Sequence, residues 1–211
     1  MEITEAPIQT DHPPHPIKNI GNGFSVSRTV LKGTLFLSVF SICFHPPNDL
    51  NVIQKRESTI LQIRSVLESR QTDLASVTKE DLAEAIYEEC IRYNHDPKFI
   101  LAVIDMESNF YNWAVSKKGA KGLMQIMPDV AQSLAQQLGI EWMGDRTLFN
   151  PFLNVKMGLY YLSQLVKDFE DLGAALTAYN YGPTYVRNLL DSKQELPLQY
   201  YRQVLSIYRT L

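Results

Sequence analysis

The sequence is poor in cysteine, has no excess of basic charge and shows no alternating pattern typical of β-strands after residue 50. Its two cysteines, Cys43 and Cys90, provide neither a disulfide framework nor a metal-ligand cluster. A net charge of −3 and a pI near 5.8 give no indication of a nucleic-acid partner. Hydrophobic residues make up 45% and charged residues 20%, which is ordinary for a soluble globular core. We therefore expect a globular protein without a metal site.

Because the period-two pattern is missing, we predict an all-α domain over residues 77–211. Several helix starts are marked by a capping residue or by a proline at the first helical position. These signals are Thr78, Asp96-Pro97, Pro128 and Asn150-Pro151. Apolar residues recur at helical spacing after each of them. Gly139 is expected to end one helix and Gly182-Pro183 another, and the last helix is expected within residues 196–211.

The N-terminal part has a different composition. Residues 1–29 are rich in Pro, His, Gly and polar groups without periodicity, so we expect them to be disordered. An apolar run over residues 30–44 follows Arg28, which is the pattern of a secretory signal or a membrane anchor. The run is shorter than the ~20 residues of a full span, and no small-x-small cleavage site follows it. A lipidated Cys43 and an apolar segment packed on the domain are the weaker alternatives.

With basic residues ahead of this run, the rest of the chain is expected to face away from the cytoplasm. The protein is therefore expected to be either membrane-anchored or secreted. Residues 45–76 are predicted to hold a linker and an amphipathic helix with a narrow, partly heptad-like apolar stripe. The stripe consists of Ile53, Ile60, Ile63, Leu67 and Leu74. This helix is a stalk, binds a partner in an envelope complex, or folds back on the domain.

Glu107 is the candidate catalytic residue. The helix predicted after Asp96 carries an apolar stripe whose continuation reaches Glu107, while Asp105 points the other way. Desolvation would raise the pKa of a glutamate in that position, and a carboxyl group protonated near neutral pH suits a general acid. On spacing alone, a helix end that opens to solvent or a glutamate paired with a buried arginine is the favoured explanation, because most glutamates in helices are not catalytic.

The residues after this helix lose periodicity and combine aromatic, small and amide side chains. Such a set beside a buried acid suits sugar binding, because sugar rings offer apolar faces and many hydroxyl groups. For Phe110, Tyr111 and Trp113, ordinary packing is the stronger explanation for each residue alone. For Gln125, support of the loop backbone is as good an explanation as substrate contact.

A series of motifs in fixed order carries a family resemblance over roughly residues 80–205. The motifs are Glu107-Ser108, Ala114-Val115-Ser116, Gly119-Ala120, Gly122-Leu123-Met124-Gln125-Ile126-Met127-Pro128, Asn150-Pro151, Asn154, Gly158, Ala178-Tyr179-Asn180 and Gly182-Pro183. The chain here resembles the catalytic domain of the soluble lytic transglycosylases, which is similar to goose-type lysozyme. The resemblance implies a lysozyme-like helical domain with a cleft between helices, and the helix expected in residues 45–76 precedes it.

The resemblance also implies residue roles. Glu107 is the single acid and base, and Ser108 stabilises the helix end or contacts sugar. The residues that match positions lining the sugar cleft or holding the glutamate are Ser116, Gln125, Met127, Tyr179 and Asn180. Tyr179 is expected to hydrogen-bond Glu107. Tyr181 stands where the family usually has a small residue, which is expected to narrow one subsite.

One carboxylate without an acidic partner favours substrate assistance over the usual two-carboxylate mechanism of glycosidases. The implied activity is cleavage of the bond between N-acetylmuramic acid and N-acetylglucosamine in peptidoglycan, with closure of a 1,6-anhydro ring. No water, metal or organic cofactor is needed for that reaction. Hydrolysis by the same residues is the first alternative, and a wall-binding or assembly module of an envelope complex is the second.

Overall fold

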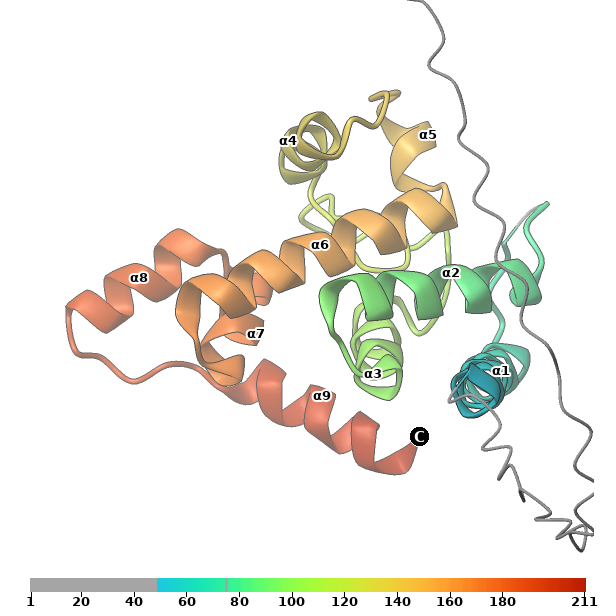
Figure 1. The fold of residues 1–211 in the computed structure, drawn as a ribbon. Coiled ribbons are helices and arrows are strands. Elements are labelled where there is room, and N and C mark those ends of the chain that lie inside the picture. Colours follow the sequence, from blue (N-terminus) through green and yellow to red (C-terminus); the bar gives the residue numbers. More distant parts are fainter. Residues whose placement is uncertain (1–48, 75) are drawn as a thin grey trace, which may run out of the picture. The chain divides into compact units, whose positions relative to one another are not determined.

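The computed structural model describes residues 49–74 and 76–211, and the regular structure in these ranges is helical (Figure 1). The helices are α1 (Asp49–Glu68), α2 (Lys79–Tyr93), α3 (Pro97–Ser108), α4 (Pro128–Leu138), α5 (Asp145–Leu148), α6 (Pro151–Phe169), α7 (Leu172–Tyr181), α8 (Pro183–Asp191) and α9 (Gln199–Thr210). Within these ranges, extended pairing is limited to isolated bridges from Lys121 to Val115 and Ile126. The all-α prediction is confirmed. The predictions for residues 1–29 and 30–44 lie outside the described residues.

The predicted helix starts are made by the expected side chains. Thr78 Oγ1 accepts the Asp81 N–H at 3.1 Å, and Asp96 Oδ1 accepts the Lys98 N–H at 3.0 Å. Asn150 Oδ1 accepts two N–H groups at the start of α6, at 3.1 and 3.2 Å. Gly139 ends α4 with a φ of 65°. These local signals act within a few residues, so the sequence alone places them well.

Two helices were not predicted, α5 and α8. The α5 helix has only 4 residues, too few to show periodicity. The α8 helix begins at Pro183, which the sequence analysis took only as the end of α7. Proline suits the first position of a helix, and Gly182 at φ +93° redirects the chain there. The same pair of residues thus ends one helix and begins the next.

The α3 helix lies in the middle of the fold, between α2 and α9 (Figure 1), and it also contacts α1. All six residues from Phe99 to Ile104 are buried, a broader apolar surface than the predicted stripe. A helix that is apolar all round is enclosed by its neighbours. Each fully buried Ile or Leu side chain contributes about 1.5–3 kcal/mol, so the first turns of α3 are firmly held. Its last turn, with Glu107, leaves the core.

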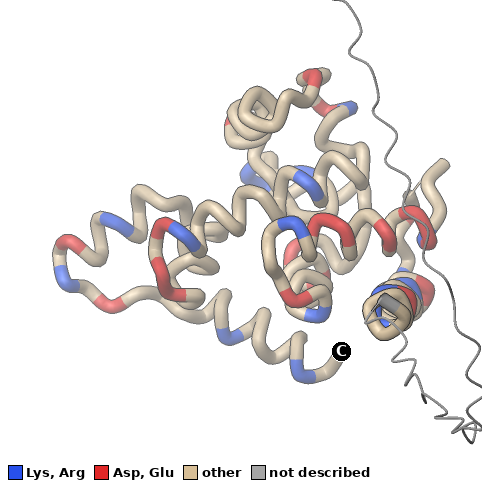
Figure 2. Tube along the Cα trace, viewed as in Figure 1, with Lys and Arg blue, Asp and Glu red and all other residues tan. Residues whose placement is uncertain are grey.

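The second half of α1 packs against the rest of the domain, as expected if the helix folds back, while its binding to a partner stays a prediction. Ile63 and Leu67 are buried in the same core as residues of α2 and α3. Charges of both signs lie along α1 and α2 (Figure 2), and Arg64 pairs with Glu80 at 2.6 Å. The first half of α1 leaves several large apolar side chains exposed. They are Leu50, Val52 and Ile53, with Leu61 further along. Of the described helices, none has the length and apolar character needed to cross a bilayer.

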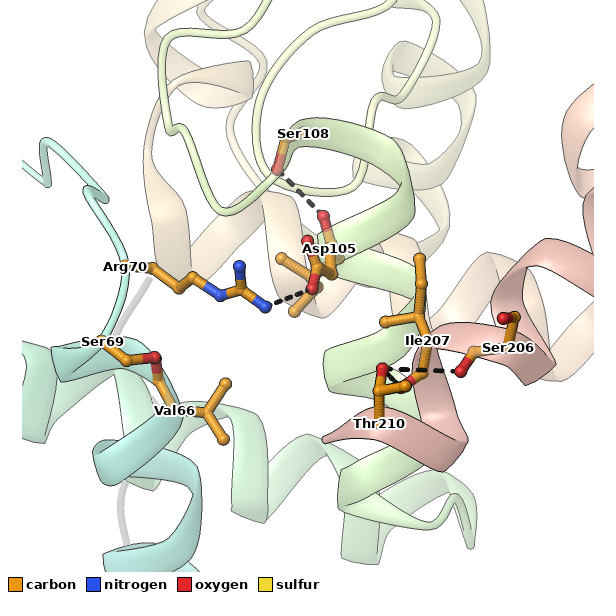
Figure 3. A network of polar contacts seen from close by, with 9 residues as sticks. Val66, Ser69, Arg70, Asp105, Ser108, Ser206, Ile207 and Thr210 are labelled. Atoms are coloured by element: carbon orange, nitrogen blue, oxygen red, sulfur yellow. Dashed lines mark hydrogen bonds and ion pairs between the residues drawn. The ribbon is translucent and has the colours of Figure 1, made fainter.

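The segment after α1 is joined to the end of α3. Arg70 Nη2 lies 2.6 Å from Asp105 Oδ2 (Figure 3), and the Arg70 guanidinium lies 5.6 Å from the centre of the Phe110 ring. Phe110 is fully buried although its φ is 62°, a left-handed conformation that is unfavourable for a bulky residue. The Asn112 N–H donates to the Thr72 carbonyl at 3.0 Å. These contacts hold the chain directly after Glu107 in a strained path.

Replacing Arg70 by alanine should lower the free energy of unfolding by roughly 2 kcal/mol, because Asp105 would be left mostly buried without its partner. The matched control is Arg56→Ala, which removes an exposed pair with Glu88 at 3.7 Å and should cost less than about 0.5 kcal/mol. Urea denaturation of both variants measures the difference. Equal losses would show that the Arg70–Asp105 pair does not hold the end of α3.

Candidate active site

Glu107 lines two cavities. The larger has a volume of about 540 Å³ and lies between the end of α3, the loop before α4, and helices α4, α6 and α7. The smaller, of about 380 Å³, is lined by residues of α3, α7 and the exposed polar face of α9. Glu107, Asn180 and Tyr181 line both. A chain-like ligand that passes from one cavity into the other would therefore cross the carboxyl.

The protonation of Glu107 depends on two opposing effects. Burial disfavours the charged carboxylate and raises its pKa, whereas a hydrogen bond donated by the Tyr200 hydroxyl to Oε1 lowers it. Burial is the larger effect, and the resulting pKa is about 7, against an ordinary value of 4.5. Near neutral pH the group is therefore present in both forms. That is the condition in which one carboxyl can both give and take a proton.

The hydrogen bond expected from Tyr179 to Glu107 is made by Tyr200, so that prediction was wrong. The Tyr179 hydroxyl donates to the Met124 carbonyl at 2.8 Å and joins α7 to the loop before α4. Tyr200 lies in the first turn of α9, which packs along α3 and brings its hydroxyl to the carboxyl. Burial raises the pKa of both phenols, so both remain donors at neutral pH. No local pattern distinguishes Tyr200 from its neighbour Tyr201.

Two predicted site residues support the loop that forms one wall of the larger cavity. Ser116 Oγ accepts the Ala120 N–H at 3.0 Å. Gln125, with a φ of 48°, donates from Nε2 to the Ala114 carbonyl at 3.0 Å and the Gly122 carbonyl at 2.9 Å. Both side chains also line the cavity. For Gln125 the structure thus shows the loop-supporting role, while contact of either residue with a ligand stays a prediction.

Asn154 supports the same loop through hydrogen bonds to backbone groups. It is fully buried, donates to the Lys121 and Leu148 carbonyls at 3.0 and 2.9 Å, and accepts the Met124 N–H at 2.8 Å. A Cβ added at Gly122 would lie 2.3 Å from Asn154 Nδ2. One added at Gly158 would lie 2.3 Å from Met124 Sδ. Backbone and side chain approach too closely at both places for any residue but glycine.

The remaining predicted residues divide into two groups. Met127, Tyr179 and Asn180 line the larger cavity together with Glu107. The Ser108 hydroxyl donates to the Ile104 carbonyl at 3.2 Å (Figure 3), at the helix end and outside the lining of both cavities. The sequence analysis missed several lining residues because each is unremarkable in its own segment. They are Lys117, Lys118, Ile126, Val130 and Tyr161 in the larger cavity, and Met106, Gln199 and Gln203 in the smaller.

Glu107 is the sole acidic side chain in the lining of these two cavities. Asp105 faces away from them, toward Arg70 (Figure 3). In residues 49–74 and 76–211, no three His, Cys, Asp or Glu side chains are grouped so that they could hold a metal ion. The arrangement therefore offers one proton donor and acceptor beside a cleft lined by aromatic, amide and small residues.

A comparison with known protein families identifies the family of the domain that contains this site. The family model described as "Transglycosylase SLT domain" matches residues 84–201, which include Glu107, the loop before α4, and Tyr200. The chain belongs to the SLT transglycosylase domain family. The α1 helix lies ahead of the matched residues.

Curated relatives agree with this assignment. Over 173 residues the chain is 30% identical to "Membrane-bound lytic murein transglycosylase C" of Photorhabdus laumondii, which covers 76% of this chain and 48% of the relative. Over 91 residues it is 33% identical to "Transglycosylase" of Enterobacteria phage PRD1, covering 43% of this chain and 31% of the relative. The chain spans half or less of the length of these curated relatives.

A solved structure supports the fold of the SLT domain. An inactive mutant of lytic transglycosylase Slt from Pseudomonas aeruginosa superposes with a TM-score of 0.50 at 24% sequence identity. The match covers 75% of this chain and 27% of that one. At this identity the comparison speaks for the fold alone, in agreement with the helical architecture described above.

Substituting Tyr200 by phenylalanine should raise the pKa of Glu107 above about 7, because the lost hydrogen bond favours the charged form. Tyr179→Phe is the matched control, since its hydroxyl bonds Met124 and not Glu107. It should lower the stability of the loop and leave the carboxyl pKa in place. NMR titration of the side-chain carboxyl carbon measures both variants. An unchanged pKa in Tyr200→Phe would contradict the role given to Tyr200.

Proposed function

We propose that this SLT domain is a peptidoglycan lytic transglycosylase that serves cell-wall remodelling or turnover. The bond cleaved is the β-1,4 linkage between N-acetylmuramic acid and N-acetylglucosamine, and the product carries a 1,6-anhydro ring. The observation that carries the proposal is a lone, partly buried carboxyl with a pKa of about 7 at the junction of two cavities. Membership of the SLT family and the relatives named lytic murein transglycosylase support it.

In the first step, protonated Glu107 gives its proton to the glycosidic oxygen as the bond to C1 of the muramic acid breaks. The oxocarbenium-like state that develops at C1 is stabilised by the acetamido group of the same sugar. A second protein carboxylate is not required for this, which agrees with the cavity lining. Tyr200 holds Oε1 of Glu107 and favours the anion that remains.

In the second step, anionic Glu107 takes the proton of the C6 hydroxyl as O6 forms a bond to C1. The glutamate returns to its protonated form and the ring closes without consuming water. Over both steps the C1–O bond to the leaving sugar is replaced by the C1–O6 bond, and the proton of the C6 hydroxyl replaces the one that Glu107 gave to the leaving oxygen, so no cofactor enters the balance. A pKa of about 7 suits both steps, because each form of the carboxyl is accessible at neutral pH.

The proposed location follows from the substrate, since peptidoglycan lies outside the cytoplasmic membrane. The apolar run over residues 30–44 would direct or tether the domain to the periplasmic side of the envelope. The relative from Photorhabdus laumondii is named as membrane-bound, which supports this placement. The exposed apolar residues of α1 would contact a partner in an envelope complex. Leu50, Val52, Ile53 and Leu61 make up this surface.

Product analysis of purified peptidoglycan tests the reaction. We expect glycan fragments that end in the 1,6-anhydro sugar, lighter by one water than the reducing ends that a hydrolase would release. Mass spectrometry of the digest separates the two products. The same peptidoglycan digested in parallel with a hydrolytic muramidase gives the reducing-end mass for comparison. Reducing ends as the main product would replace the transglycosylase by a lysozyme-like hydrolase.

Activity should fall as the pH rises through about 7, because the first step needs the protonated carboxyl and the fraction of that form decreases. Glu107→Gln should lower the rate by roughly 10³-fold at every pH, since an amide cannot deliver the proton. Release of soluble fragments from labelled wall between pH 5 and 9 measures both. Persistent digestion by Glu107→Gln would remove the carboxyl from the mechanism. A wild type that never digests wall would favour a binding module.

A further inference from the structure

Two tyrosines form an exposed aromatic pair at the mouth of the cleft. Tyr181 is the last residue of α7 and Tyr185 lies in the first turn of α8. Their ring centres are 5.5 Å apart with an interplanar angle of 33°, and the residues are 43% and 44% exposed. Within the part of the chain that the structure describes, neither hydroxyl forms a hydrogen bond to another residue. The pair therefore faces solvent with its rings held against each other.

Tyr181 lies close enough to Glu107 to contact a substrate bound at the carboxyl. Tyr181 lines both cavities, as do Glu107 and Asn180. A second aromatic pair at this end of the larger cavity, Tyr161 with Tyr179, has the same centre distance of 5.5 Å but is partly buried. Tyr181 thus lies where a glycan strand would pass from one cavity into the other, with Tyr185 packed against it.

We propose that Tyr181, backed by Tyr185, binds one sugar ring of the glycan by stacking at this crossing. The inference rests on the proposed function and names a residue that sets how tightly this domain holds its substrate. The face of a sugar ring is a surface of C–H groups that packs well on an aromatic ring. The hydroxyl and acetamido groups at the edge of the same ring then have polar partners within reach in Asn180, Gln199 and Gln203.

The Tyr181 ring binds the strand and does not block it. Glu107 lines both cavities with the Tyr181 ring in place, so the ring leaves the carboxyl residue accessible from each cavity. The contact with Tyr185 keeps the Tyr181 ring from turning freely, which lowers the conformational entropy lost when a sugar packs on it. Tyr185 lines neither cavity and acts through Tyr181, so it is a positioning residue.

Binding is measured by calorimetry with Glu107→Gln as the reference protein and a purified tetrasaccharide of alternating N-acetylglucosamine and N-acetylmuramic acid as the probe. Adding Tyr181→Ala should raise the dissociation constant roughly 3- to 10-fold, the range expected for one lost aromatic contact. Tyr181→Phe keeps the ring and should stay within about twofold. Tyr111→Ala is the matched control, because Tyr111 is 41% exposed and lines neither cavity.

In the active protein, Tyr181→Ala should raise KM and leave kcat nearly unchanged, since the contact is made equally in the bound ground state and the transition state. Tyr185→Ala should raise KM less, and Tyr185→Phe should restore the wild-type value. A purely structural role for Tyr185 would not give this split. Circular dichroism and thermal melting of each variant confirm that the fold is kept.

Unchanged or tighter tetrasaccharide binding in Tyr181→Ala would overturn the proposal and make the ring an obstruction. This result is separate from a failure of the proposed function. If the reference protein binds the tetrasaccharide but the active protein releases reducing ends, the reaction is hydrolysis and the proposed function is wrong. The stacking contact is then still tested by the binding of the Tyr181 variants. If the reference protein binds no glycan, both proposals are wrong.

Discussion

The Glu107 carboxyl is held between burial, which favours its neutral form, and the Tyr200 hydroxyl, which favours its anion. Neither effect alone suits a group that has to give a proton and then take one. Burial without a donor would keep the carboxyl protonated, and a solvent-exposed carboxyl would be ionised at neutral pH. Their balance sets the pKa to about 7, and much of the surrounding structure serves to keep it there.

The first support is the α3 helix itself. Its turns from Phe99 to Ile104 are enclosed by α1, α2 and α9, so its last turn projects from a rigid core. Arg70 then fixes the helix end through Asp105 and covers Phe110 in its left-handed conformation. Strain of this kind persists only where the surroundings enforce it. The segment after α1 therefore contributes to the site although it precedes the residues matched by the SLT family model.

The second support is the loop before α4, which forms the wall opposite the carboxyl. Asn154 satisfies three backbone groups of this loop and of the chain beside it, and Tyr179 bonds a fourth. Gly122 and Gly158 allow the close approach that these bonds need. Asn154 and Tyr179, both part of the motifs that carry the family resemblance, thus hold the cavity wall in place. Backbone support therefore explains part of the motif that these residues form.

The helical class, most helix starts and the one acidic residue lining the two cavities could be predicted without the structure, because caps, periodicity and the Glu107 motif act within a few residues of each other. The sequence could not show which tyrosine bonds Glu107, since Tyr200 is 93 residues away along the chain. It also left open the course of α1, the start of α8 and the two cavities that share Glu107. Those features depend on how α9 and α1 pack against α3, and packing between distant segments is decided by the tertiary structure.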